Sequence, residues 1–239
     1  MLFRLGLSAL LSISLVGCMH TPAVSDQSKD RSSVMLVSEK SWHSKAEKSY
    51  NQIVKEAKKK NTLVVDPKLD RIMHKMLPYA VEFRPEAKDW NWQINAHLNG
   101  TLNAYGFAGG KIILNTALYW QLELTEEELA FVIAHEMSHE LLEHSRQKMS
   151  ASLLLGSLPT YLTHGVSQMW LHESEADLLA LQLMKKAGMN PKAGSSFFKK
   201  LTVETERRRQ LKVNQTLMTA DFMKYRQQAI DTSLSNSVS

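Results

Sequence analysis

The stretch from residue 125 to residue 144 constrains the fold of this chain more than any other. Thr125, followed three residues later by Glu128, predicts a capping box, and the acidic first turn suits the positive end of a helix dipole. Apolar residues then recur at helical spacing, which predicts one helix over the whole stretch. The apolar positions are Leu129, Val132, Ile133, Met137, Leu141 and Leu142.

Two histidines and a glutamate on this predicted helix form the pattern His-Glu-x-x-His. His135 and His139 are four residues apart, so both imidazoles project from nearly the same side and can reach one metal ion. Glu136 lies beside them, where it can take a proton from a water at that metal. An accidental match is the alternative for so short a motif. Against it, a polar triad in an apolar helix is costly unless the protein uses it.

A catalytic zinc site needs a third protein ligand and one open position. Glu173, on a long helix predicted over residues 165–187, is the natural third ligand. Asp177 lies on the same helix face, where its carboxylate can hydrogen-bond a ligand histidine and hold its tautomer. Glu175 projects about 200° away from Glu173, so it is the poorer ligand candidate. His144 is expected off the ligand face of its own helix, in a structural role.

The N-terminus predicts a bacterial lipoprotein signal over residues 1–17. Arg4 is the charged start, and residues 5–16 form an apolar core that is too short to span a membrane comfortably. The core ends in Leu-Val-Gly-Cys, which resembles a lipobox, and Cys18 is the only cysteine of the chain. We therefore expect cleavage before Cys18 and attachment of fatty acyl chains such as palmitate, which together anchor the protein to a membrane. A secreted protein with an incidental cysteine is the alternative.

The rest of the chain predicts a flexible tether followed by one domain. Residues 18–38 are polar and Ser-rich without periodicity, residues 39–230 carry the helix and strand patterns, and residues 231–239 are expected to be a disordered tail. A chain of 239 residues with 44% hydrophobic residues can bury one sizeable core. Met19 after the cysteine favours the outer membrane over the inner membrane, with the domain on the periplasmic side.

A small antiparallel sheet is expected before the metal-binding helix. Residues 90–98 alternate between apolar and polar side chains, which predicts a half-buried strand. Asn99-Gly100 predicts a hairpin turn into residues 101–107, and a turn at 108–110 leads to a further strand. If that strand is the sheet edge, its free backbone groups could pair with an extended peptide; an ordinary internal hairpin is the alternative. Its residues are Lys111, Ile112, Ile113, Leu114 and Asn115.

Two further patterns are weaker. The net charge is +5, and the basic runs at 58–60 and 207–209 are short. They favour solvated helix faces, so we expect no nucleic-acid partner. The Leu-rich stretch 151–162 is broken by Gly156 and Pro159 and is too short to cross a bilayer. It could be a buried helix, a lid over the cleft or a membrane-touching surface, and we expect it to be buried.

Five motifs, in order, resemble metallopeptidase family forty-eight, which includes the CAAX prenyl protease, the heat-shock protease HtpX and periplasmic quality-control proteases of bacteria. The resemblance extends over about residues 66–230 and is far more specific than the metal motif alone. The motifs are Asn103-Ala104, Gly109-Gly110-Lys111-Ile112, the run from Glu128 to His139, Glu173-Ser174-Glu175-Ala176-Asp177 and Ala187-Gly188-Met189-Asn190-Pro191.

The resemblance implies an α+β fold, namely a mainly helical, zincin-like (gluzincin) metalloprotease domain with a small antiparallel sheet beside the metal-binding helix. It also implies a zinc-dependent endopeptidase with one Zn²⁺ per chain. Since long apolar spans are lacking, the chain looks like the soluble, lipid-anchored type. The implied roles are zinc binding by His135, His139 and Glu173, general-base catalysis by Glu136, and support of a ligand by Asp177.

One departure from the family pattern concerns the C-terminal part. The family often shows Thr-His-Pro there, with an Arg five residues after the Pro. Here Ala220 and Asp221 replace the His and the Pro, whereas Arg226 is present. We expect Arg226 to hold a carboxylate such as Asp177, in preference to stabilising an oxyanion. No histidine follows His172, which adjoins the third ligand and could support the site or lie exposed.

The combined interpretation is a lipid-anchored metalloendopeptidase that degrades misfolded or misassembled periplasmic and outer-membrane proteins. Such envelope proteins are its expected substrates, the anchor is its expected contact with the membrane, and a regulatory envelope partner is compatible with this. The alternative is an envelope chaperone or assembly factor with a latent peptidase site. A lipid-anchored structural module, with an accidental motif and no bound metal, is the third interpretation.

Overall fold

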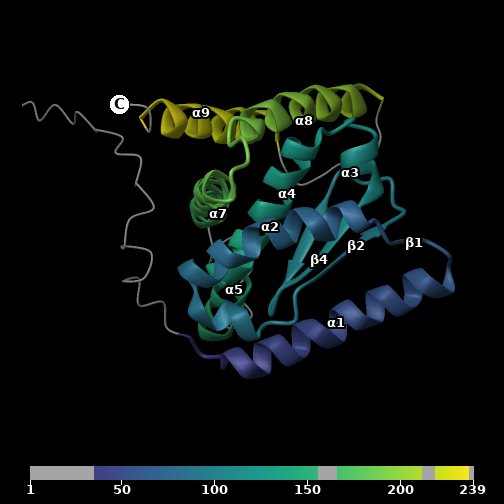
Figure 1. Cartoon of the computed structure of the whole chain (residues 1–239), viewed down its shortest axis with the longest axis vertical. Helices are drawn as coiled ribbons and strands as arrows, with labels where there is room; N and C mark the ends of the chain where they lie inside the picture. Colours follow the sequence, from purple (N-terminus) through teal and green to yellow (C-terminus); the bar gives the residue numbers. More distant parts are fainter. Residues whose placement is uncertain (1–34, 156–165, 212–218, 237–239) are drawn as a thin grey trace, which may run out of the picture.

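Helices surround one small sheet in the computed structural model, which describes residues 35–155, 166–211 and 219–236 (Figure 1). The expected α+β class, with helices predominating, is confirmed. The elements in chain order are α1 (Glu39–Lys59), β1 (Leu63–Val64), α2 (Pro67–Phe83), the 3₁₀ helix η2 (Pro85–Asp89), β2 (Gln93–His97), β3 (Ala104–Phe107), β4 (Lys111–Asn115), α3 (Thr116–Trp120), α4 (Glu126–Leu141), α5 (His144–Leu155), α7 (Val166–Lys186), α8 (Ala193–Gln210) and α9 (Ala220–Asn236).

The sheet is mixed, so the prediction of an antiparallel sheet is wrong. Its strand order is β1-β2-β4-β3, in which β2 pairs parallel with β4 while β1 and β3 each pair antiparallel with their neighbours. Asn99-Gly100 therefore does not join two paired strands. The tight turn at 108–110, between β3 and β4, is the hairpin that the sequence predicted correctly. Gly109 and Gly110 have φ of 87° and 85° there, which glycine adopts without strain.

The third predicted strand lies inside the sheet, so of the two alternatives that the sequence left open for it, the edge position is excluded. It is β4, whose residues Lys111, Ile112, Ile113, Leu114 and Asn115 are all buried. A strand that is covered on both faces favours an interior position, because both of its backbone edges can then be paired. The edges of the sheet are β1 and β3 instead. β2 shows the alternation of half-buried and buried residues that its sequence predicted.

Helix α4 begins as predicted but ends earlier. The Thr125 hydroxyl accepts a hydrogen bond from the Glu128 N–H at 3.2 Å, and the Glu128 carboxylate accepts one from the Thr125 N–H at 2.9 Å. The helix then runs through the middle of the domain and packs against α2, α7, α8 and β3. It ends at Leu141, because Glu143 takes a left-handed φ of 56°, and α5 starts at His144. The prediction of one helix up to His144 is wrong.

The core forms on both sides of α4. Apolar side chains of α4 join one buried cluster with residues of α2, β4, α7 and α8. A fully buried Leu, Ile, Met or Phe side chain contributes about 1.5–3 kcal/mol to the stability of the fold, relative to the same side chain exposed to water. In Figure 1, α8 and α9 lie along one side of the molecule and α1 along the opposite side. Members of the cluster include Leu69, Met73, Ile112, Leu114, Leu129, Ile133, Met137, Met184 and Phe198.

The ends of several elements bear on the predicted domain limits. Helix α1 begins at Glu39, where the sequence predicted the domain to begin. Helix α9 continues to Asn236, so the prediction of a disordered tail is wrong over residues 231–236. The predicted signal, Cys18 and the tether up to residue 34 lie outside the described residues.

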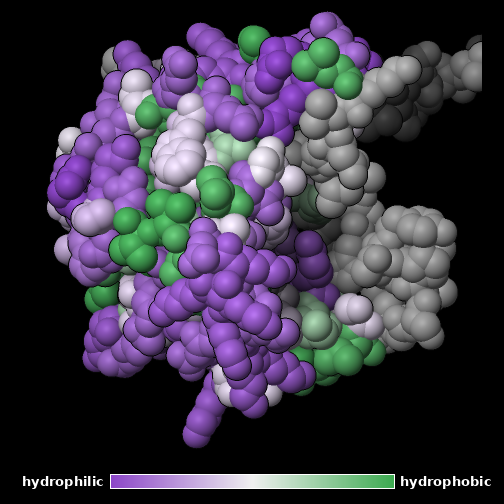
Figure 2. Space-filling view, turned by 90° about the vertical axis from the view of Figure 1, so that its right-hand side faces the viewer, coloured by the Kyte–Doolittle hydropathy of each residue, from purple (hydrophilic) through white to green (hydrophobic). Residues whose placement is uncertain are grey.

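The Leu-rich stretch is only partly described, since residues 156–162 lie outside the described ranges. Its first residues continue α5, and Leu153 is 57% exposed, so the prediction of a buried stretch is wrong at that position. On the face drawn in Figure 2, apolar side chains form separate patches within a mainly hydrophilic surface. Among the residues that the structure describes, no helix combines the length and the apolar character needed to cross a bilayer.

Candidate metal centre

Three predicted ligands converge between α4 and α7. His135 Nε2 lies 3.0 Å from His139 Nε2, and Glu173 places one oxygen 3.4 Å from His135 Nε2 and the other 3.5 Å from His139 Nε2. Donor atoms bonded to a tetrahedral zinc at about 2.0–2.1 Å lie roughly 3.3 Å apart. The three side chains therefore have the chemistry and the spacing of a zinc site.

The close packing of α7 on α4 brings Glu173 to the histidines. Ala176 and Ala180 are fully buried on α7, and such small side chains let two helices approach closely. Glu173 and Asp177 lie one turn apart on α7, as the sequence predicted, and both face α4. The i, i+4 spacing on each helix thus orients two side chains toward the same point.

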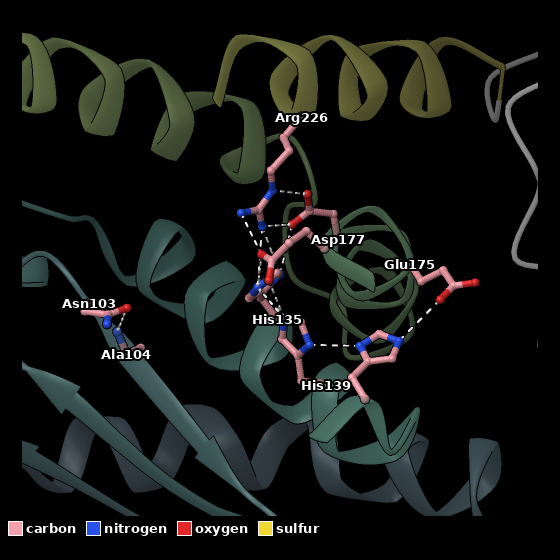
Figure 3. A network of polar contacts seen from close by, with 9 residues as sticks. Asn103, Ala104, His135, His139, Glu175, Asp177 and Arg226 are labelled. Carbon is pink, nitrogen blue, oxygen red and sulfur yellow. Dashed lines mark hydrogen bonds and ion pairs between the residues drawn. The ribbon is translucent and has the colours of Figure 1, made fainter. Parts of the chain in front are cut away.

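Asp177 supports His135 from behind. Its Oδ1 lies 2.9 Å from His135 Nδ1, and Arg226 of α9 donates to both carboxylate oxygens of Asp177 at 2.7 Å (Figure 3). Arg226 Nη1 also lies 2.9 Å from Glu173 Oε2. The contact between Arg226 and Asp177 is the one that the sequence analysis preferred. A buried arginine therefore connects α9 to the carboxylates of Glu173 and Asp177 on α7.

These contacts shift the pKa values of the candidate ligands. Burial and the charge of Arg226 lower the pKa of His135, but hydrogen bonds to Asp177 and Glu173 outweigh both and raise it to about 9. Burial raises the pKa of Glu173, but the charge of Arg226 and the hydrogen bond from His135 hold it well below its usual range. Burial, followed by the charge of His135, lowers the pKa of His139 well below its usual value. Negative Glu173 beside His135 therefore favours a cation at this point.

Glu136 lies at a cavity next to these ligands. The cavity has a volume of about 170 Å³, and its lining includes Gly106, Glu136, His139 and Glu173. Burial raises the pKa of Glu136, which makes its carboxylate a better proton acceptor than an exposed glutamate. The side chain is thus beside the candidate ligands and open to a molecule in the cavity.

Strand β3 passes close to Glu136. A Cβ atom on Gly106 would lie 3.0 Å from Glu140 Oε1 and 3.3 Å from Glu136 Oε2, so a larger residue here would require the two glutamates to shift by a few tenths of an ångström. Just before β3, the Asn103 side chain accepts a hydrogen bond from the Ala104 N–H at 3.0 Å (Figure 3). The edge strand next to the cavity is therefore β3, which was not among the candidates from the sequence, because only residues 111–115 were considered for the edge.

A second group of candidate ligands also escaped the sequence analysis. His144, His172 and Glu175 bring ligand atoms within 4.8 Å of one another beside the first site. His172 and Glu175 are three residues apart on α7 and therefore share a face, a spacing that could have indicated the group. His144 joins them because α5 starts anew after the break at Glu143.

Residues 64–173 match the model of peptidase family M48. The match covers 110 of the 239 residues, so the similarity to family M48 holds for this part of the chain. The match takes in His135, Glu136 and His139 and ends at Glu173. The mainly helical fold with a small sheet is that of a zincin-like M48 domain.

Similar proteins include further proteases. Over 130 residues, this chain is 29% identical to the Beta-barrel assembly-enhancing protease of Escherichia coli K12 and 28% identical to the protein of the same name from Yersinia pestis. Each alignment covers 43% of this chain and 26% of the relative. The Mitochondrial metalloendopeptidase OMA1 of Schizosaccharomyces pombe is 26% identical over 130 residues, covering 47% of this chain and 38% of the relative. The chain thus spans about a quarter of the length of the bacterial relatives.

Proposed function

We propose that this chain is a zinc-dependent endopeptidase that binds one Zn²⁺. His135, His139 and Glu173 are the ligands, and Glu136 is the general base. The observation that carries this proposal is the convergence of two imidazole nitrogens and a carboxylate beside a buried glutamate at a cavity. The match of residues 64–173 to the model of peptidase family M48 supports the same reaction class.

The position of each side chain indicates its role in the proposed reaction. A zinc ion held by these residues would supply a Lewis acid for the scissile carbonyl and would make a water acidic near neutral pH. Glu136 takes the proton of that water and later passes it to the leaving nitrogen. Asp177 holds His135 in the tautomer whose Nε2 faces the metal, and Arg226 holds Asp177 in place.

Strand β3 is the proposed contact for the substrate backbone. It pairs with β4 on one side only, and Gly106 brings it beside Glu136. An extended peptide can add to such an edge through backbone hydrogen bonds, which recognise a chain without regard to its sequence. This mode suits a protease that acts on unfolded segments.

The proposed location is the periplasmic face of the bacterial outer membrane, with a lipid anchor on Cys18. The lipobox at the end of residues 1–17 and the polar tether up to residue 38 support it. The bacterial relatives are named for β-barrel assembly. This supports misfolded or misassembled envelope proteins as substrates, in a quality-control role that a regulatory envelope partner could modulate.

Replacement of the proposed base tests the assignment. Glu136→Gln should retain zinc but lower cleavage of casein or of an unfolded outer-membrane protein by about 10²–10⁴-fold, because proton transfer is lost. Zinc is measured by elemental analysis and cleavage by gel electrophoresis. Cleavage at the wild-type rate would show that Glu136 is not the base.

Replacement of single ligands tests the metal site itself. His135→Ala or Glu173→Ala should lower the zinc content of the purified protein. His74→Ala is the matched control, because His74 is exposed on α2 and its replacement should leave the content unchanged. If a ligand variant kept the wild-type zinc content, that residue would not be a ligand.

A chaperone or assembly factor with a latent peptidase site is the second candidate. It is favoured by the names of the bacterial relatives, which combine assembly with proteolysis. In that case wild type would bind an unfolded outer-membrane protein without cleaving it, and Glu136→Gln would bind it equally well. Cleavage by wild type that Glu136→Gln abolishes would exclude latency.

A further inference from the structure

The ligand His139 has its own chain of supporting contacts, separate from the one behind His135. His139 Nδ1 lies 2.8 Å from His144 Nδ1, and His144 Nε2 lies 3.3 Å from Glu175 Oε2. Figure 3 shows these contacts running from His139 to Glu175. We propose that Glu175, acting through His144, positions His139 and holds the tautomer whose Nε2 faces the metal. This inference rests on the proposed zinc site.

The assignment follows from counting protons. A neutral imidazole carries one N–H, so His139 can offer its Nε2 lone pair to a metal only if its Nδ1 carries the proton. That Nδ1–H donates to His144 Nδ1, which must then accept. The one N–H of neutral His144 is therefore on Nε2, where it donates to the Glu175 carboxylate. A negative acceptor at the end fixes the direction of both hydrogen bonds.

The surroundings hold His144 in this position. Its side chain is buried, and the ring of His172 stacks on it with centroids 4.2 Å apart and planes at 9°. The break at Glu143 turns the start of α5 back toward α4, so that His144 faces His139 although it is five residues further on. The two metal histidines therefore have different support, which is a carboxylate on His135 and a histidine-carboxylate pair on His139.

The same contacts argue against a second metal ion. His144, His172 and Glu175 have the types and spacing of metal ligands. A metal on His144 Nε2 would displace the proton that Glu175 accepts. With His139 also bound to a metal, the two rings would then share a single proton between their Nδ1 atoms and carry a net negative charge. We therefore expect one zinc per chain in the wild-type protein.

Three variants test the proposal through zinc affinity, measured by competition with a chelator. His144→Leu removes the acceptor and should weaken zinc binding by about 10–100-fold. His144→Asn places an amide oxygen near the former Nδ1 and should recover part of this loss. His172→Phe, the control, keeps an aromatic ring against His144 but removes the ligand nitrogens, so affinity should stay at the wild-type value.

A direct readout of the tautomer distinguishes positioning from packing. Long-range ¹H–¹⁵N spectra of the zinc-loaded full chain should show the proton of His139 on Nδ1 and the proton of His144 on Nε2. Glu175→Gln keeps the volume but removes the charge, so it should weaken zinc binding less than His144→Leu. It also serves as the test should His144→Leu fail to fold.

The failures are distinguishable. If folded His144→Leu and Glu175→Gln bound zinc as tightly as the wild type, the positioning role would be overturned. The zinc peptidase proposal would still hold in that case, provided that the wild-type chain binds zinc and cleaves its substrate. If the wild-type chain bound two zinc ions and His172→Phe bound only one, His144, His172 and Glu175 would be ligands of a second metal site instead. A wild-type chain that binds no zinc would overturn both proposals.

Discussion

At the scale of single residues, Arg226 connects more of the site than any other described side chain. It is 3% exposed, pairs with Asp177 and Glu173, and its guanidinium lies 4.6 Å from the ring centroid of Phe198. A buried charge depends on its partners, because water cannot replace them. Removing one partner leaves the others buried without compensation.

Arg226→Met should lower the free energy of unfolding by about 3–5 kcal/mol, since it leaves two buried carboxylates without their cation. Urea denaturation followed by circular dichroism measures this loss. Arg209→Met is the matched control, because Arg209 forms an exposed ion pair with Glu206 whose loss should leave the free energy of unfolding nearly unchanged. Equal losses in the two variants would contradict the role given to burial.

At the scale of elements, Glu128 joins the start of α4 to α8. Its carboxylate accepts the capping-box hydrogen bond from Thr125, and on α8 it accepts hydrogen bonds from Ser196 and, at 2.7 Å, from Lys200. Burial raises the pKa of Glu128, but the hydrogen bonds from Lys200 and Ser196 outweigh it and lower the pKa from 4.5. The Glu128 carboxylate therefore caps α4 and also joins α4 to α8.

Glu128→Gln should therefore lower the free energy of unfolding by about 1–3 kcal/mol at pH 7. Because folding lowers the pKa of Glu128, its contribution is present above pH 4.5, the ordinary value, and is lost as the pH falls through the folded value. The difference from wild type should shrink on acidification below that value. Denaturation at several pH values measures it, with exposed Glu126→Gln as the control. A difference that persisted at acid pH would contradict the linkage.

At the scale of the whole molecule, the candidate zinc site joins α4 to α7, and α9 covers it through Arg226. A ligand that binds only the folded state stabilises it, by about 2.7 kcal/mol when its free concentration is 100 times its dissociation constant. The metal should therefore raise the stability of the domain as a whole.

Zinc should raise the Tm of the chain in a concentration-dependent way, and a chelator should reverse the increase. Differential scanning calorimetry measures this. Glu136→Gln should keep the increase, because the base is not a ligand, whereas His139→Ala should lose most of it. A Tm that zinc leaves unchanged in the wild type would contradict a metal site between the two helices.

The local features of this protein were predictable from its sequence. The capping box at Thr125, the helical spacing of His135 and His139, and the pairing of Glu173 with Asp177 depend on residues at most four positions apart. Periodicity and capping report such neighbours directly, because one turn of helix determines which side chains share a face. The candidate ligands and the candidate base could therefore be predicted from local sequence patterns.

The long-range arrangement was decided by the tertiary structure alone. The parallel pairing of β2 with β4, and hence the choice of β3 as the edge, depends on which strand the packed helices bury. The helix break at Glu143 occurs at a non-glycine residue, so the sequence gives no turn signal for it. The contact from His144 to Glu175 joins residues that are 31 positions apart. Local patterns carry no signal for such pairs, since their energy arises only when α4, α5 and α7 pack together.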